Sequence, residues 1–345
     1  MALQVREDVL LAQLTTFGVG GAARWFAQAT TEAEVADAVL WAQERQLPLF
    51  VLGGGSNLLV EDSGFPGLVL RMEIGGVEPL GAGRFEVGAG VVWDHFVTET
   101  VERGCAGVEC LAGIPGSVGG TPVQNVGAYG QDVSETIEAV RVYDREQASF
   151  RWLQRSECRF RYRESRFNTE EPGRFIVVRV RFQLREHGSP ELRYAELRKR
   201  FDGQTNPSLR EVSAAVREIR RSKGMLLTEG DPDCHSAGSF FRNPVVAQER
   251  LQAIAAAAAV PVADVPHWPA GEGLLKLPAA WLLERAGFVK GFGEGPVGIS
   301  RKHTLALVNR GGATFADVAR FQQQIVERVH LVFGVELVRE PVTLR

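Results

Sequence analysis

Cysteine is scarce in this chain: only 4 of its 345 residues are cysteines. They lie singly at Cys105, Cys110, Cys158 and Cys234, without a CxxC pair. Because a chain of this length can bury a core of its own, we expect neither a disulfide framework nor a zinc site. The 6 histidines show no metal-ligand spacing either, so we expect no bound metal.

The sequence also lacks a long apolar run. Its longest weakly polar stretch, Ala253 to Ala263, is too short to span a bilayer and contains Pro261. The amino terminus has no apolar core of a signal peptide. A net charge of −3, without a basic run interleaved with aromatic residues, gives no attraction to nucleic acid. We therefore expect a cytoplasmic globular protein of about two or three domains, with no membrane insertion and no nucleic-acid partner.

Glycine, by contrast, is abundant and unevenly placed. It supplies 38 residues, and half of them, 19, lie between Gly53 and Gly130. No Gly-X-Y period accompanies them and proline occurs only 16 times, which excludes collagen-like and low-complexity sequence. Such enrichment inside a globular composition indicates backbone that turns tightly or approaches a ligand closely.

The apolar periodicity predicts an α+β protein with mixed sheets. Helices are predicted at 32–46, 92–102, 211–223, 246–259 and 278–286, and after Thr314, where Thr-x-x-Asp indicates a capping box. Strands are predicted at 24–27, 49–52, 58–60, 68–70, 85–87, 139–143, 175–184, 297–299, 305–308 and 335–338, with a turn at 62–67. No internal repeat is visible.

The segment Gly53-Gly-Gly-Ser-Asn57 follows an apolar strand and offers a row of backbone N–H groups. Such nests bind phosphate or pyrophosphate oxygens. The alternative is a β-bulge or hairpin turn, although three glycines exceed what a turn requires. Gly18–Ala23 also matches the dinucleotide pattern GxGxxA, but a strand-like segment follows where that pattern needs a helix. We interpret it as a turn.

The segment from Gly113 to Gly130 holds six glycines and two prolines among apolar residues. It is suited to irregular backbone inside the protein, whose N–H and C=O groups need partners. A planar heterocycle with several acceptors, such as an isoalloxazine, would supply many of them. The alternative is a structural Ω-loop, although such loops are usually more polar.

Three further segments carry polar side chains whose functional interpretation competes with an ordinary one. The arginine-rich stretch 161–166 is either a solvated strand face or a clamp for a carboxylate or phosphate. Ser239, in 236–244, is a possible proton donor but lies in no GxSxG elbow, and alone the segment is typical of a turn before a helix. Glu340, after an apolar strand, is by itself more often a surface residue.

Together the segments resemble the UDP-N-acetylenolpyruvoylglucosamine reductases, in their longer subtype. The resemblance runs from Leu14 to Glu340 and rests on six motifs in order. They are LGGGSNLLV (52–60), IPGSVGGTPVQNVGAYG (114–130), FRYRESRF (160–167), SAGSFFRNP (236–244), KLPAAWLLERAGF (276–288) and RKHTLALVN (301–309).

The resemblance implies a two-module FAD-binding region of the vanillyl-alcohol-oxidase type and a C-terminal α+β substrate-binding domain. The implied FAD-binding modules are 1–72 and 73–206, and the C-terminal strand 335–345 could join the second of them. The implied substrate-binding domain is 207–334. FAD is expected to be held non-covalently. The expected FAD-binding residues are Gly53, Gly54, Gly55, Ser56, Asn57, Ile114, Pro115, Gly116, Ser117, Gly119, Gly120, Thr121, Gln124, Asn125, Gly127, Ala128 and Tyr129.

The reaction implied is the NADPH-dependent reduction of UDP-N-acetylglucosamine enolpyruvate to UDP-N-acetylmuramate in bacterial peptidoglycan synthesis. Hydride passes from NADPH to the flavin and then to the vinyl carbon distal to the carboxylate. Arg163 and Glu340 match the residues that stabilise the resulting enolate-like intermediate, Glu340 as a protonated acid, and Ser239 matches the proton donor. The family also implies substrate contacts by Tyr194, Lys223, Asn243 and His303, and we expect a monomer.

Three positions depart from the family's pattern. Near the C-terminus the chain reads Arg339-Glu-Pro-Val where Glu-Val is more typical, although the glutamate is present. Thr15 stands where the family has asparagine before Thr-Phe, and the segment after Lys223 is longer than its usual Lys-x-Pro turn. Two other interpretations compete with the reductase. A flavin-dependent oxidase or dehydrogenase of small alcohols gives no reason for Arg163, Ser239 and Glu340 to occur together. The same trio argues against a non-catalytic protein that only binds flavin or a nucleotide sugar.

Overall fold

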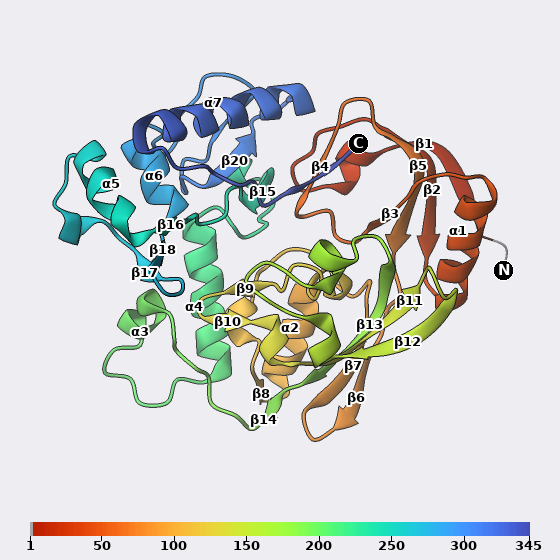
Figure 1. Cartoon of the computed structure of the whole chain (residues 1–345). Helices are drawn as coiled ribbons and strands as arrows, with labels where there is room; N and C mark the ends of the chain where they lie inside the picture. Colours follow the sequence, from red (N-terminus) through yellow and green to blue (C-terminus); the bar gives the residue numbers. More distant parts are fainter. Residues whose placement is uncertain (1–2) are drawn as a thin grey trace. The chain divides into compact units, whose positions relative to one another are not determined.

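The computed structural model describes residues 3–345, and contacts between residues divide them into two units (Figure 1). Unit 1 comprises the described residues up to Val9, Ala22–Gly55 and Phe65–Arg221. Unit 2 comprises Leu10–Gly21, Ser56–Gly64 and Ser222–Arg345. Two N-terminal segments therefore belong with the C-terminal part of the chain. The division into three modules stays a prediction, and it places these two segments differently.

Unit 1 begins with a four-stranded sheet in the order β1-β2-β5-β3. Its strands are β1 (Val5–Leu10), β2 (Ala22–Ala29), β3 (Leu49–Leu52) and β5 (Phe65–Met72). Both β2 and β3 pair with β5 in parallel, and α1 (Glu32–Glu44) makes the connection between them. Thr31 and Glu34 cap α1 reciprocally, which explains why the helix begins at Glu32.

An antiparallel five-stranded sheet, β12-β11-β13-β7-β6, forms the second part of unit 1. Its strands are β6 (Val77–Gly81), β7 (Arg84–Gly88), β11 (Ile137–Asp144), β12 (Ser149–Gln154) and β13 (Phe175–Gln183). The helix α2 (Trp93–Glu102) packs with the sheet through buried rings: Phe96 lies 4.7 Å from Phe182, ring centroid to centroid. Figure 1 shows α2 beside this sheet.

Shorter elements complete unit 1. They are β8 (Cys105–Ala106), β9 (Gly127–Ala128), β10 (Gln131–Asp132), β14 (Arg185–Glu186), α3 (Ala195–Arg200) and α4 (Leu209–Ser222), whose last residue falls in unit 2. The chain also has single turns of 3-10 helix and one π-helical turn. These are η1 (Leu11–Leu14), η2 (Glu109–Leu111), η3 (Val118–Gly120), η4 (Val133–Glu135), η5 (Arg155–Cys158), η6 (Arg166–Glu170, π), η7 (Pro232–Cys234), η8 (Gln248–Arg250) and η9 (Val262–Asp264).

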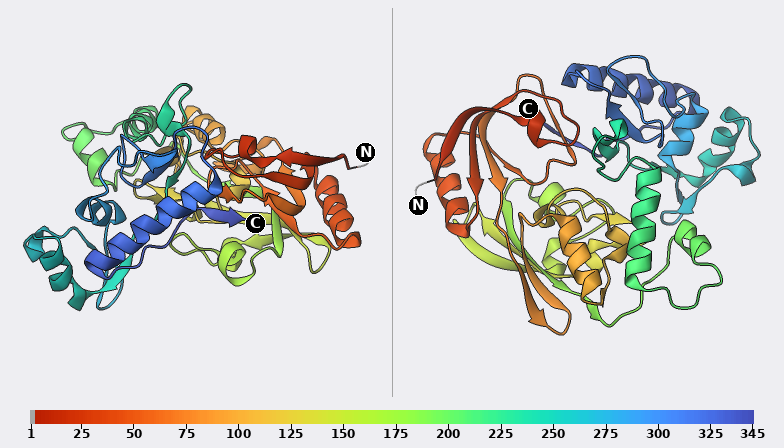
Figure 2. Two further views of the ribbon diagram at one scale, coloured as in Figure 1. Left: turned by 90° about the horizontal axis from the view of Figure 1, so that it is seen from above. Right: turned by 180° about the vertical axis from the view of Figure 1, so that it is seen from behind.

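Unit 2 contains three small sheets in the orders β15-β20-β19, β16-β18-β17 and β21-β4. Their strands are β4 (Leu58–Val60), β15 (Ser236–Ser239), β16 (Val245–Ala247), β17 (Trp268–Pro269), β18 (Leu274–Lys276), β19 (Val297–Ile299), β20 (Ala306–Asn309) and β21 (Val342–Leu344). Its helices are α5 (Leu251–Ala257), α6 (Ala279–Arg285) and α7 (Phe315–Phe333). The long helix α7, seen side-on in Figure 2, packs against α5, α6 and β19.

Most predicted elements are confirmed, including the capping box at Thr314 and the strand after Gly18–Ala23. Three predictions are wrong. Residues 246–250 precede α5, since Val245–Ala247 form a strand with β18. Phe65 to Gly67 belong to β5 instead of a turn.

The predicted strand 335–338 is the third error. The alternating burial of Val335 and Leu337 resembles a strand, but this stretch has no ladder of its own. The C-terminal strand is instead β21, and it pairs in parallel with β4. The described residues contain no helix with both the length and the apolar character that a membrane crossing requires.

Candidate active site

The two glycine-rich segments lie against each other in unit 1. A Cβ on Gly53 would lie 2.6 Å from Ser117 Oγ, and one on Gly54 would lie 2.6 Å from Gly116 Cα. Since real Cβ atoms do not approach neighbours this closely, glycine is required for the two backbones to meet. The structure therefore brings together two segments that are 60 residues apart in the sequence.

The long segment 113–130 is docked on the connection between β7 and α2. Val118 and Gly119 donate their backbone N–H groups to the carbonyls of Val91 and Ala89, at 2.9 and 2.8 Å. A Cβ on Gly119 would lie 2.6 Å from Ala89 Cβ, which again requires glycine. In the middle of the segment, the irregular backbone therefore makes hydrogen bonds to other backbone groups, because buried N–H groups need acceptors.

Two buried polar side chains of this segment make hydrogen bonds, Thr121 within the segment and Asn125 to other parts of unit 1. Thr121 Oγ1 donates to the carbonyl of Val118 at 2.8 Å. Asn125 Oδ1 accepts from the N–H of Ser134 at 3.2 Å, and Asn125 Nδ2 donates to the carbonyl of Arg161 at 2.9 Å. Asn125 therefore joins the glycine-rich segment to the arginine-rich one. A direct contact of these two side chains with FAD stays a prediction.

The end of the segment is closed by Arg220, which sequence analysis missed. Its side chain is buried, and Nε donates to the carbonyl of Gly113 at 2.9 Å. Burial lowers the pKa of Arg220, while a hydrogen bond with Tyr129 opposes this shift. The signal was present: Val212, Val216 and Arg220 recur every four residues, which places Arg220 on the buried face of α4.

Two tyrosines assigned to different ligands lie side by side. Tyr129 is a predicted FAD contact and Tyr194 a predicted substrate contact. Their rings pack edge to face, with centroids 5.3 Å apart. Tyr129 has a left-handed backbone (φ 50°), and Tyr194 precedes α3 and remains exposed. The structure therefore brings these two residues together in unit 1.

Arg163 lies on strained backbone in the two-residue turn that the β-bridge of Arg161 with Glu164 closes, shortly before the π-helical turn η6. Its φ is 58°, which costs an L-residue on the order of 1–2 kcal/mol. Its Nη2 donates to the carbonyl of Gly127 at 2.7 Å, so the guanidinium meets the glycine-rich segment. The side chain of Arg163 therefore points inward onto a loop, and its role as a clamp for a carboxylate or phosphate stays a prediction.

In unit 2, Ser239 and Glu340 lie on neighbouring extended segments. Ser239 is the last residue of β15 and is opposite Ala306 of β20. The N–H of Glu340 donates to the carbonyl of Phe240 at 2.9 Å, and Phe241 and Arg339 form a β-bridge. Glu340 is thus bonded to the residue next to Ser239, so two predicted catalytic residues 101 positions apart are brought together.

Asn57 holds the same segment of unit 2. Its carbonyl accepts from the N–H of Val342 at 3.0 Å, and its Nδ2 donates to the carbonyl of Glu340 at 3.4 Å. Thr16 Oγ1 donates to the carbonyl of Ser236 at 2.6 Å, which ties the N-terminal segment to the strand of Ser239. Thr15, where the family has asparagine, makes a local turn, since its hydroxyl accepts from Gly18 N–H at 3.2 Å.

Lys223 and His303, two predicted substrate contacts, are neighbours in unit 2. Burial first, and then the charges of Lys223 and Lys290, lower the pKa of His303 to about 4. The N–H of Leu305 donates to Nδ1 of His303 at 2.9 Å. Because Nδ1 is an acceptor, the neutral ring carries its proton on Nε2 and can donate only from there.

Asn243, a predicted substrate contact, also makes a structural hydrogen bond. Its Oδ1 accepts from the N–H of Ala279, the first residue of α6, at 3.0 Å. The oxygen end of the amide therefore satisfies a helix terminus. Nδ2 is the end suited to an anionic oxygen of a ligand.

The predicted site residues divide between the units. Unit 1 carries Gly53, Gly54, Gly55, Ile114, Pro115, Gly116, Ser117, Gly119, Gly120, Thr121, Gln124, Asn125, Gly127, Ala128, Tyr129, Arg163 and Tyr194. Unit 2 carries Ser56, Asn57, Lys223, Ser239, Asn243, His303 and Glu340. The boundary falls inside the motif 52–60, between Gly55 and Ser56.

Comparison with known families separates two regions of the chain. Residues 23–151 match the family described as FAD binding domain, and residues 231–344 match the family described as UDP-N-acetylenolpyruvoylglucosamine reductase, C-terminal domain. The first match covers both glycine-rich segments, and the second covers Ser239 and Glu340. The chain is an FAD-containing oxidoreductase of α+β fold, as the sequence predicted.

Whole-length relatives identify the family. UDP-N-acetylenolpyruvoylglucosamine reductase of Streptomyces coelicolor is 47% identical, with 99% of this chain and 91% of the relative covered. The protein of the same name from Pseudomonas aeruginosa is 41% identical, with 99% of each covered. The crystal structure of the reductase of Thermus caldophilus has a TM-score of 0.68 at 28% identity, covering 99% of this chain and 100% of that one. The chain belongs to the UDP-N-acetylenolpyruvoylglucosamine reductase family.

The residues of unit 1 fit FAD. Gly53 and Gly54 leave no side chain between their backbone and the segment around Gly116, and a Cβ on Gly120 would meet no atom within 4 Å. Main-chain N–H groups suit phosphate oxygens and the acceptor edge of a flavin, although those of Val118 and Gly119 already donate to protein carbonyls. The backbones of 53–55 and 114–129 are therefore the parts of unit 1 that would hold FAD.

Proposed function

We propose that this chain catalyses the NADPH-dependent reduction of UDP-N-acetylglucosamine enolpyruvate to UDP-N-acetylmuramate, for bacterial peptidoglycan synthesis. We further propose that it acts as a cytoplasmic monomer that holds FAD non-covalently. The observation that carries the proposal is the pairing of Phe240 and Phe241, which directly follow Ser239, with the segment of Arg339 and Glu340. This pairing lies in the part of the chain that matches the reductase's C-terminal domain.

Bound FAD supplies the two-electron chemistry by which hydride passes from NADPH to the vinyl carbon distal to the substrate carboxylate. Negative charge then develops on the carbon next to the carboxylate and on the carboxylate itself. The guanidinium of Arg163 and the carboxyl of Glu340 stabilise that charge in the proposed mechanism. The hydrogen bond that Arg163 donates to the carbonyl of Gly127 fixes the direction of the guanidinium, so little reorganisation is needed at the moment of reaction.

Ser239 completes the addition by giving its hydroxyl proton to the carbon that bears the carboxylate, and water returns a proton to the serine. A serine hydroxyl is a weak acid, but a reactive enolate needs only a close, aligned donor. The strand β15 supplies that alignment, since Ser239 lies in register with Ala306. Hydride and proton together account for the two hydrogens of the product.

The nucleotide end of the substrate is assigned to Lys223, Asn243, His303 and Tyr194. Lys223 brings positive charge to a diphosphate. His303, neutral at pH 7 because its pKa is about 4, donates from Nε2. Asn243 donates from Nδ2, since its Oδ1 accepts from Ala279.

The test is an assay of the purified protein. We expect a yellow protein with a flavin spectrum, and NADPH oxidation that requires the enolpyruvyl substrate. NADPH oxidation that ignores this substrate would contradict the reductase and favour another flavin-dependent oxidase or dehydrogenase. A colourless protein that fails to bind added FAD would contradict both flavoenzyme interpretations.

A further inference from the structure

We propose that Asn168 is a positioning residue for Arg163. Its side-chain amide clamps the backbone on both sides of Glu164, and so fixes the direction in which the Arg163 guanidinium leaves the chain. The proposal rests on the role of Arg163 in the proposed function. It adds a residue that none of the six sequence motifs contains, since the motif FRYRESRF ends at Phe167.

Both ends of the Asn168 amide are bonded to backbone. Oδ1 accepts from the N–H of Ser165 at 2.8 Å, and Nδ2 donates to the carbonyl of Arg163 at 3.2 Å. An N–H faces one end and a carbonyl faces the other, so only this orientation of the amide satisfies both partners. A side chain with one kind of polar atom cannot make the same pair of bonds.

The clamped backbone is of a kind that needs external support. Arg163 has φ 58°, in the left-handed region, and it lies in a two-residue turn that a single β-bridge closes, shortly before the π-helical turn η6. Strained residues persist where surrounding contacts over-determine them, and π-helical turns are frequent at functional sites. Ser165 adds a second restraint, because its Oγ donates to the carbonyl of Val123 in the glycine-rich segment at 2.6 Å.

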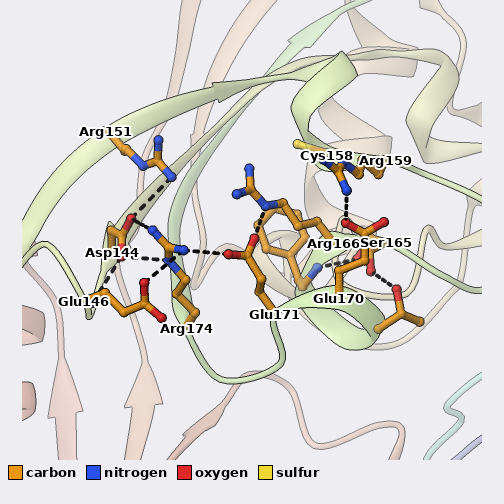
Figure 3. A network of polar contacts seen from close by, with 12 residues as sticks. Asp144, Glu146, Arg151, Cys158, Arg159, Ser165, Arg166, Glu170, Glu171 and Arg174 are labelled. Atoms are coloured by element: carbon orange, nitrogen blue, oxygen red, sulfur yellow. Dashed lines mark hydrogen bonds and ion pairs between the residues drawn. The ribbon is translucent and has the colours of Figure 1, made fainter.

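The far side of η6 is fixed to the five-stranded sheet by ion pairs (Figure 3). Arg166 pairs with Glu171, and Glu171 with Arg174 at 2.6 Å. Arg174 pairs in turn with Asp144, whose side chain is fully buried at the end of β11, at 2.9 Å. Asn168 is part of this anchored turn, and its amide links the turn to the backbone of the strained arginine.

The informative variant is Asn168→Asp. Aspartate keeps the size and the acceptor for the N–H of Ser165, but places an oxygen where Nδ2 donated to the carbonyl of Arg163. The matched control is Glu170→Gln, which breaks the ion pair with Arg159 on the same turn and touches no backbone of Arg163. FAD content and the thermal unfolding midpoint establish that each variant is folded.

Stopped-flow absorbance measures the two half-reactions separately: flavin reduction by NADPH, and reoxidation by the enolpyruvyl substrate. For Asn168→Asp we expect reoxidation to slow about tenfold or more, because small displacements of a charged group cost rates of this size. Flavin reduction and the KM for the substrate should stay within about twofold of the parent. Glu170→Gln should leave both half-reactions unchanged.

A double-mutant cycle with Arg163→Ala tests whether Asn168 acts through the arginine. If it does, Asn168→Asp adds less than about a twofold effect in the Arg163→Ala background. A further slowing there, or equal slowing of both half-reactions, would overturn the positioning role in favour of a general structural one. Unchanged reoxidation in Asn168→Asp, beside a slow Arg163→Ala, would also overturn it and leave the proposed function intact. Normal reoxidation in Arg163→Ala would instead remove Arg163, and with it the basis of the inference, from the mechanism.

Discussion

Arg163 in unit 1 lies in a two-residue backbone turn that side chains clamp, whereas Ser239 and Glu340 in unit 2 are held mainly by backbone pairing. The arginine lies on left-handed backbone that depends on Asn168, Ser165 and the ion pairs behind η6. Ser239 lies on β15, and Glu340 is bonded through its N–H to the carbonyl of Phe240. Backbone hydrogen bonds survive most side-chain substitutions, but a hydrogen bond made by a side chain is lost when that side chain is replaced.

This difference predicts where substitutions outside the chemistry will be felt. In unit 1, changes to residues that never meet a ligand should still displace a reactive group. In unit 2, the positions of Ser239 and Glu340 should tolerate changes to neighbouring side chains, because strand pairing would survive them. The substitutions below test this contrast in order of expected effect.

Asp144→Asn should have the largest effect on stability. Asp144 accepts two hydrogen bonds from Arg174, at 3.1 and 2.9 Å, and the pKa of Asp144 is lowered chiefly by this partner. Asp144→Asn leaves Arg174 its pairs with Glu171 and Glu146, but it weakens hydrogen bonds to a buried carboxylate, and a hydrogen bond to a charged group contributes about 1.5–3 kcal/mol. We expect a loss of this order in urea unfolding, together with slower flavin reoxidation by substrate.

The control for this prediction is Glu146→Gln. Glu146 pairs with the same Arg174, but its side chain is 67% exposed. Exposed pairs contribute little, so the variant should lose less than about 1 kcal/mol. Equal destabilisation by the two substitutions would contradict the importance given to the buried end of the network.

Gly54→Ala should weaken FAD binding by roughly 10- to 100-fold, since overpacking typically costs 1–3 kcal/mol. The added Cβ would lie 2.6 Å from Gly116 Cα, so the two glycine-rich segments would separate. Fluorescence titration of the apoprotein with FAD measures the change. Gly75→Ala is the control, because a Cβ there meets no atom within 4 Å. Parent-like FAD affinity in Gly54→Ala would show that the contact between the segments does not shape the cofactor site.

His303→Gln tests a smaller, pH-dependent effect in unit 2. The pKa of His303 falls from 6.5 to about 4 on folding, so the unfolded chain binds the extra proton between these values. The stability that this neutral histidine contributes is therefore fully present above about pH 6.5 and is lost as the pH falls toward 4. At about 1.4 kcal/mol per pKa unit, the loss is at most about 3 kcal/mol.

Urea unfolding at pH 7.5, 6 and 5 measures this loss directly. The parent should lose more stability between pH 7.5 and 5 than His303→Gln does, because glutamine does not titrate. Identical pH dependence in the two proteins would contradict a buried, neutral His303.

Much of the site was predictable where its signal is local in the sequence. The close approach of Gly53 and Gly54 to another backbone follows from the absence of side chains. The capping boxes at Thr31 and Thr314 begin α1 and α7 as their sequences indicate. Arg163, Ser239 and Glu340 were identified by their match to motifs of the reductase family. Their catalytic roles remain predictions.

What the sequence did not reveal depends on contacts between distant residues. The burial pattern of Val335 and Leu337 imitates a strand, although the true strand partner of the C-terminal residues is β4, more than 280 residues earlier. The spacing of Val212, Val216 and Arg220 indicates a buried face, but the partners of Arg220, Gly113 and Tyr129, are known only once the glycine-rich segment is in place. The contacts of Asn168 with the backbone of Arg163 and Ser165 likewise form only when η6 is folded.

The most direct test of the account is Ser239→Ala, followed through both half-reactions. We predict flavin reduction by NADPH at the rate of the parent protein. Reoxidation by the enolpyruvyl substrate should be slower by roughly 100- to 10,000-fold, the range for loss of a positioned proton donor. Reoxidation at the parent rate, with FAD content and substrate affinity unchanged, would contradict the assignment of Ser239 as the donor.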